Sequence, residues 1–228
     1  MITRLVKKFL MAATCAVAVA GAQSAHAQYY EMVNQVPALL SPALSGSFNY
    51  KGYVEASGIA GIGNNRVNII GLSTSQGFQY SSWFFMGAGI GIDVAMNNTD
   101  VPSPDYDRPG YWEHSSSTTK IMVPVFSDFR FNFGDTGSMS FFIDIKAGAM
   151  WLMGNSYLRL QHGCMTGDAQ FYLKPSLGLR IPVNSRNPRQ AVNIGLAYQL
   201  ITSDNNYSYW NNNTLTLNGL GVSIAYEW

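Results

Sequence analysis

Large apolar side chains alternate with small or polar ones over the last nine residues of the chain. Across residues 220–228 every even position is large and apolar, while the odd positions are Gly, Ser, Ala and Glu. A period of two is typical of a β-strand with one apolar face. An apolar face that ends in an aromatic residue fits a strand packed against lipid, because Trp and Tyr anchor at the membrane interface. The pattern predicts the closing strand of a membrane barrel.

The same alternation recurs along the chain and predicts eight strands. Their expected spans are residues 48–60, 66–80, 82–96, 119–133, 138–152, 169–181, 190–201 and 215–228. We therefore predict an all-β fold, an eight-stranded antiparallel up-and-down transmembrane β-barrel. Because proline removes a ladder hydrogen bond from a strand, we expect local bulges at Pro124 and Pro175.

Charged residues fall on the opposite parity of these strands. The outer face excludes them, because an Arg or Lys at the bilayer midplane costs about 2–4 kcal/mol. Side chains fill the interior of an eight-stranded barrel, and charges enclosed there must be paired. We predict a plugged lumen with a structural network of six basic and five acidic residues: Lys51, Glu55, Asp93, Lys120, Asp128, Arg130, Asp144, Lys146, Lys174, Arg180 and Glu227.

The connections between the predicted strands alternate in length. Short turns are expected at residues 81–82, 134–137 and 184–188, and longer loops at residues 97–118, 154–167 and 202–213. In outer-membrane barrels the short turns are periplasmic and the long loops are extracellular. Both chain ends are then expected on the periplasmic side.

The first 27 residues have the pattern of a cleaved secretory signal. Three basic residues precede an apolar run over residues 9–21 and a small-residue site at Ala25-His26-Ala27. Without them, eleven of the fourteen basic residues remain against thirteen acidic ones. The chain then lacks the net positive charge that is typical of proteins that bind nucleic acid. We divide the chain into a signal peptide (1–27), an N-terminal periplasmic segment (28–47) and the barrel (48–228).

The barrel region resembles the small Gram-negative outer-membrane barrels, in the style of the OmpA barrel domain and OmpX. The resemblance rests on the signal, the strand pattern, the segments 50–55 and 83–91, and the terminal Tyr226-Glu227-Trp228. It implies a protein of the outer membrane, inserted by the barrel assembly machinery. That machinery reads the last strand, so Tyr226 and Trp228 would form the assembly signal. The resemblance transfers no catalytic residue.

One predicted outer loop contains residues that suggest chemistry. His114 and Ser116 match the His-x-Ser spacing of some barrel lipid hydrolases, with Glu113 as a candidate acid. Extending the strand that begins near residue 119 would point His114 and Ser116 inward, away from lipid, which disfavours catalysis. Acidic residues of this loop have no EF-hand spacing, so we expect no metal site and no cofactor.

Aromatic residues concentrate in two predicted outer loops, the second of them rich in asparagine. They are Tyr106, Tyr111, Trp112, Tyr207, Tyr209 and Trp210. Such residues can form an interfacial girdle, or they can bind a glycan or a protein with large contact area at low entropic cost.

These observations favour a monomeric, non-enzymatic outer-membrane barrel with an envelope-structural or surface-interaction role. Its expected partners are outer-membrane lipid, the assembly machinery and an extracellular glycan or protein. The alternatives are an envelope-lipid-modifying barrel enzyme and a small-solute channel. A filled lumen would disfavour the channel, and the geometry around His114 would decide the enzyme.

Overall fold

The computed structural model describes residues 49–97, 116–117, 119–134, 137–154, 157–160, 163–165, 168–183, 189–204 and 214–228. The predicted signal peptide and N-terminal segment lie outside these residues, so their boundaries stay predictions. No helix among the described residues is long and apolar enough to cross a membrane.

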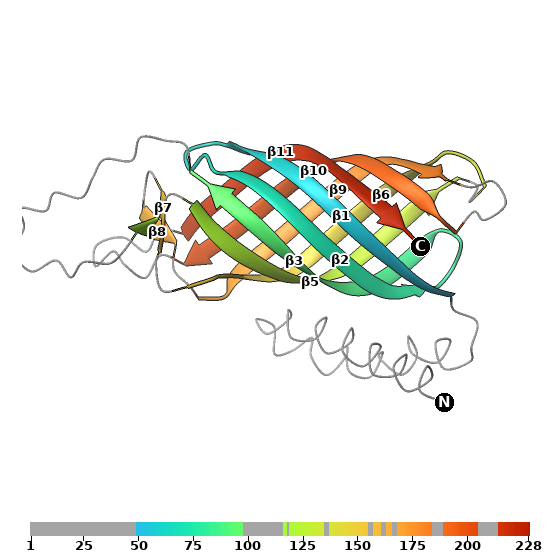
Figure 1. The fold of residues 1–228 in the computed structure, drawn as a ribbon, viewed down its shortest axis with the longest axis horizontal. Coiled ribbons are helices and arrows are strands. Elements are labelled where there is room, and N and C mark those ends of the chain that lie inside the picture. Colours follow the sequence, from blue (N-terminus) through green and yellow to red (C-terminus); the bar gives the residue numbers. More distant parts are fainter. Residues whose placement is uncertain are drawn as a thin grey trace, which may run out of the picture.

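Eight antiparallel strands close into a barrel, which confirms the predicted fold class (Figure 1). Going round the barrel, their order is β1, β11, β10, β9, β6, β5, β3 and β2. The bounds are β1 Asn49–Ile62, β2 Asn68–Gln79, β3 Phe84–Met96, β5 Thr119–Phe133, β6 Ser140–Leu152, β9 Gln170–Pro182, β10 Ala191–Asp204 and β11 Thr214–Glu227. Each pair of barrel strands that are consecutive along the chain is also adjacent in space.

The strand register tilts the barrel. A path that starts at Gly52 and follows directly opposed residues from strand to strand passes through Ala88, Ala147 and Leu200. It returns to β1 at Ile62, ten residues further along the strand. Strand number and this shear together set the width of a barrel, and eight strands leave an interior that side chains can fill.

The two ends of the barrel differ. One end, which we call the turn end, holds the start of β1 and the C-terminus (Figure 1). The described residues 80–83, 137–139, 183 and 189–190, which border the shorter connections, lie at the same end. The opposite end, the loop end, holds the first turn, around Gly63, and the ends of the strands that lead into and out of the three longer connections. Gly63 and Gly134 have φ values of 83° and 121°, which glycine adopts without steric cost.

The predicted bulges at Pro124 and Pro175 are wrong. Beside each proline the ladder to one neighbouring strand loses two residue pairs, between β5 and β3 for Pro124 and between β9 and β10 for Pro175. The register is the same before and after each gap, and the ladder to the other neighbour is unbroken. The strands therefore accommodate the missing N–H groups without an inserted residue.

Exposed apolar side chains cover the outer wall, and the inner wall is largely polar. Leu72, Ile92, Leu177 and Leu196 are each about 60% exposed on different strands, whereas all eleven predicted inner charges are buried. A water-soluble protein does not expose apolar residues over an entire sheet. Alternation of apolar outward and polar inward residues is the pattern of a transmembrane barrel.

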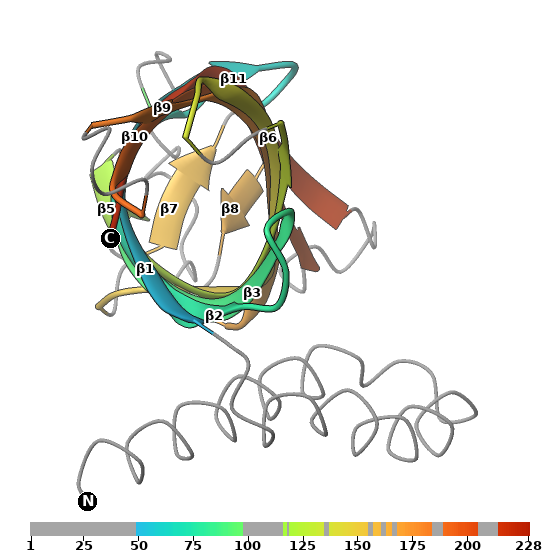
Figure 2. The same ribbon diagram turned by 90° about the vertical axis from the view of Figure 1, so that its right-hand side faces the viewer.

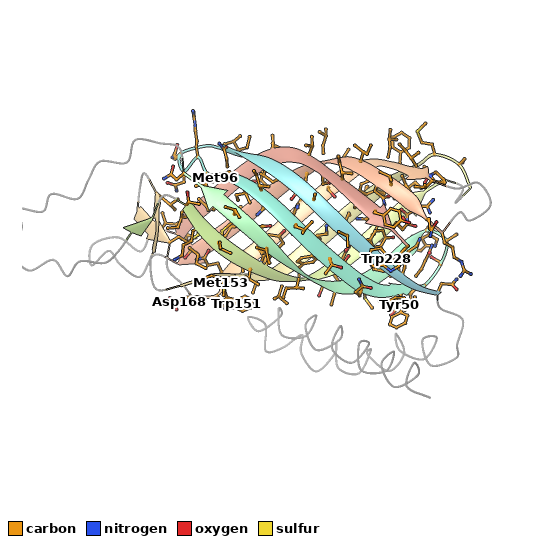
Figure 3. The ribbon with its side chains drawn as sticks, viewed as in Figure 1. Tyr50, Met96, Trp151, Met153, Asp168 and Trp228 are labelled. Carbon is orange, nitrogen blue, oxygen red and sulfur yellow. The ribbon has the colours of Figure 1, made fainter. Side chains whose placement is uncertain are left out.

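Aromatic side chains mark the turn end of the wall. Trp83 stacks on Phe131 with ring centroids 6.1 Å apart, and Tyr226 stacks on Trp228 at 6.3 Å. Tyr50 and Trp228 lie close to the same end, whereas Trp151 lies at the other (Figure 3). Aromatic rings at such positions anchor a barrel at the membrane interface.

The last residue closes the seam between the first and last strands. The main-chain N–H groups of Gly52 and Trp228 each donate to the other's carbonyl, at 3.2 and 3.1 Å. The Trp228 ring covers Gly52, where a Cβ atom would lie 2.5 Å from the indole Cζ2. The glycine therefore makes room for the terminal indole beside the closing hydrogen bonds.

We expect Gly52→Val to reduce the amount of folded barrel, because valine would push the indole away from the seam. Gly58→Val is the matched control, since nothing lies within 4 Å of a Cβ at this outward-facing position of β1. Heat-modifiable mobility in membrane fractions measures the folded amount. Equal amounts from the two variants would show that the Trp228 contact does not matter for closure.

A second, small sheet lies across the loop end. It consists of β4 (Ser116–Ser117), β7 (Tyr157–Leu160) and β8 (Gly163–Met165), with β4 parallel and β8 antiparallel to β7. Viewed along the barrel axis, β7 and β8 lie across the opening (Figure 2). The sequence pattern predicted long loops here, so this sheet is an addition to the expected fold.

Candidate functional site

Five charges of alternating sign form a chain through the middle of the lumen. In order they are Arg130, Asp144, Lys146, Glu55 and Lys174. The nitrogen–oxygen distances along the chain are 3.0, 3.4, 2.5 and 2.9 Å. All five side chains are buried, so each charge depends on its neighbours rather than on bulk water.

Glu55 joins opposite walls of the barrel. Lys146 and Lys174 face each other directly on the adjacent strands β6 and β9. Like charges in such a pair repel each other. Glu55 reaches from β1, which is four strands away from β6 round the barrel, and accepts hydrogen bonds from both lysines. The Glu55 carboxylate is thus a strut across the lumen.

Aromatic rings surround the guanidinium of Arg130. Its Cζ lies 4.0 Å from the centroid of the Tyr53 ring and 4.9 Å from that of Phe142. One of its nitrogens, Nη2, donates to Asp144, while Nε and Nη1 have no hydrogen-bond partner among the described residues. Cation–π attraction partly compensates a buried guanidinium in this position.

Neutral side chains donate hydrogen bonds to two further acids of the lumen, Asp128 and Asp93, and the second oxygen of Asp128, Oδ1, has no hydrogen-bond partner among the described residues. Ser75 donates to Asp128, which faces Lys146 directly across the β5–β6 ladder. Gln199 of β10 donates to Asp93 of β3 at 3.2 Å. Since β3 and β10 are four strands apart in the barrel order, this pair is a second strut.

A separate cluster lies at the turn end. The carboxylate of Glu227 accepts from Arg180 at 2.8 to 3.2 Å, from Asn193 at 3.4 Å, and from Lys51. One buried acid therefore serves two buried cations. The remaining predicted charge, Lys120, is buried near the start of β5 at the loop end, apart from both groups.

The loop-end half of the lumen is largely apolar, although it also buries Lys120, which corrects the picture of an interior filled throughout with charge. Inward-facing residues of the wall pack with three side chains of the small sheet: Leu158, Leu160 and Met165. We call these three the apolar plug. A side chain at Gly89 would clash with the ring of Phe126 in the same region, so the glycine makes room for that ring. The alternation of Leu158 and Leu160 is the one signal in the sequence that could have revealed the plug.

The aromatic residues predicted to form a binding surface lie outside the described residues. This applies to all six: Tyr106, Tyr111, Trp112, Tyr207, Tyr209 and Trp210. Glu113 and His114 also lie outside them. Ser116 belongs to β4, which pairs with β7 and not with the barrel wall. The expectation that residues 114 and 116 extend a barrel strand is therefore wrong for Ser116.

The described residues contain no group of three or more His, Cys, Asp or Glu side chains arranged to hold a metal ion. The acidic loop residues considered for calcium are not among them. Within the described part of the chain, the carboxylates of the lumen have basic or hydroxyl and amide partners instead.

No family model matches the chain, and no curated protein matches it. Among solved structures it is similar to Neisserial surface protein A (NspA), with 11% sequence identity and a TM-score of 0.47. That alignment covers 79% of this chain and 95% of NspA. The outer membrane enzyme PagL is also similar, at 15% identity and a TM-score of 0.43 over 76% of this chain and 97% of PagL. The fold assignment rests on this chain's own closed topology and the polarity of its two faces.

Proposed function

We propose that this chain is a non-enzymatic outer-membrane barrel that acts through its outer loops, as an envelope-structural or surface-interaction protein. The observation that carries the proposal is the filled lumen, with two ion-pair clusters below the apolar plug. A barrel whose interior is occupied by its own side chains offers its exposed ends as sites of interaction.

Two features favour the outer loops, rather than the lumen, as the place where this protein acts. Struts from β1 to β6 and from β3 to β10 cross the interior at the level of Glu55 and Asp93. Above them, the plug adds buried apolar contacts at the loop end. A solute path would have to break both layers, whereas the loop residues Tyr111, Trp112, Tyr209 and Trp210 carry the composition of a recognition surface.

The test is binding by the folded barrel in lipid nanodiscs to an array of extracellular glycans. We expect saturable binding that falls by about tenfold or more in Tyr111→Ala/Trp112→Ala or in Tyr209→Ala/Trp210→Ala, since aromatic anchors dominate such interfaces. Trp83→Ala removes an exposed aromatic residue from the turn end and is the matched control.

A lipid assay separates this proposal from the enzymatic alternative. The same nanodiscs, prepared with lipopolysaccharide and phospholipid, are incubated and analysed by mass spectrometry for released or transferred acyl chains. We expect none. Acyl release that disappears in His114→Ala would replace the proposal with a lipid-modifying enzyme.

A further inference from the structure

The turn end contains an open cavity of about 370 Å³, and Tyr50, Tyr80 and Trp228 are among its lining residues. Strands β1, β2 and β9, the connections that follow β2 and β9, and the terminal Trp228 contribute to its lining. Among the described residues that line it, three are basic, Lys51, Arg180 and Arg189, and none is acidic. The cavity therefore has a positive wall.

Glu227 balances part of the positive charge of this wall. Lys51 and Arg180 are 6% and 2% exposed, and they share one carboxylate, that of Glu227. A charge in such a partly desolvated position acts more strongly on a ligand than one on an open surface. Arg189 is exposed and adds a third cation at the opening.

Neutral groups complete the cavity. The hydroxyl of Ser81 is buried and has no hydrogen-bond partner among the described residues, although it belongs to a lining residue. Tyr80 and Trp228 supply aromatic surface in the same lining. A donor without a partner, beside basic groups and rings, suits a ligand that combines an anionic group with an apolar or sugar portion.

We propose that this cavity binds a small oxyanion, a carboxylate or phosphate carried on a sugar or glycerol group. Arg189 attracts it at the opening, and Lys51 and Ser81 donate to it inside. On the periplasmic side, where the short turns are expected, two sources of such chemistry would meet this end of the barrel: the phosphate headgroup of a membrane lipid and a carboxylate-bearing saccharide of the cell wall. The proposal is independent of any role of the outer loops.

The experiment follows the indole N–H resonance of Trp228, identified by its loss in Trp228→Phe, in the ¹⁵N-labelled barrel in zwitterionic micelles. N-acetylmuramic acid and glycerol 3-phosphate are the anionic probes, and N-acetylglucosamine is the uncharged control. We expect a saturable shift with at least one anion and none with the control. Arg189→Glu should weaken binding by about tenfold or more, because it replaces a charge-assisted contact with repulsion. Arg66→Glu, at the loop end, should leave it unchanged.

Nanodiscs distinguish the two sources. If lipid is the source, adding phosphatidylglycerol to phosphatidylcholine nanodiscs shifts the Trp228 resonance and competes with the soluble anions. If it leaves the resonance unchanged, the soluble saccharide is the ligand. Ser81→Ala, which keeps every charge, should weaken binding less than Arg189→Glu. The proposal is overturned if no anion shifts the resonance saturably, or if Arg189→Glu and Arg66→Glu bind alike while both remain heat-modifiable.

Discussion

Leu196→Arg should lower the free energy of unfolding of the barrel in lipid by about 2–4 kcal/mol, because it places a charge on the lipid face near the middle of the membrane. Leu196 lies near the centre of β10 and is 62% exposed. Its directly opposed neighbours are Leu177 on β9 and Val222 on β11, both exposed as well. The arginine would therefore enter a continuous apolar surface without a partner.

Urea titration in phospholipid vesicles, followed by tryptophan fluorescence, measures this loss. Leu196→Met is the matched control, because it keeps an apolar side chain of similar volume at the same position. If Leu196→Arg unfolds at the same urea concentration as Leu196→Met, the outer wall does not face lipid.

Glu55→Gln should lower the free energy of unfolding by about 3–5 kcal/mol, since it leaves buried charges without their partner. Glu55 is the acceptor for both Lys146 and Lys174, which face each other directly across the β6–β9 ladder. The substitution removes the negative charge between these two cations and keeps the size of the side chain. The ion pair of the β1-to-β6 strut is lost at the same time.

A double variant measures whether the charges of Glu55 and Lys174 are coupled. Glu55→Gln/Lys174→Met removes one of the two lysines, so we expect it to recover a large part of the stability lost in Glu55→Gln. Lys174 also donates to Ser57 at 2.7 Å, so the recovery will be incomplete. If the two changes are simply additive in urea titrations, Glu55 and Lys174 are not coupled.

The strands of the barrel wall could be predicted from the sequence, because the alternation of apolar and polar residues can be seen within each strand alone. A strand between lipid and a polar lumen must alternate, and each predicted strand span overlaps an observed one with ends that differ by three residues or fewer. The parity of charges such as Asp144 and Lys146 follows from the same alternation, and the structure buries both.

The partners of those charges could not be predicted, because they depend on which strands face each other across the lumen. Lys146 is next to Asp128 along the ladder, yet its shortest ion pair is with Glu55 on the far wall. Barrel closure and shear bring them together, and neither is visible in a single strand. The apolar plug was missed for a different reason: Leu158 and Leu160 lie in a strand of four residues, Tyr157–Leu160, which is too short for its alternation to stand out.

Prolines show the limit of a local rule. The missing N–H of Pro124 or Pro175 predicts a disturbance of the ladder. In the structure, the ladder is interrupted toward only one of the two neighbouring strands of each proline. The remaining pairs on both sides hold the register, so the chain has no need to insert a residue. Cooperative pairing over a closed sheet outweighs one lost hydrogen bond.

The most direct test of a filled lumen is the ionic current through single purified barrels in a planar lipid bilayer. The ion pairs around Glu55 and the plug around Leu158 predict no stable open level in the unmodified protein, even at high salt. Weakening both layers, with Glu55→Gln and Leu158→Ser, should produce brief openings. A persistent, porin-like current from the unmodified protein would contradict the account, and the charged residues of the lumen would then line a conducting path.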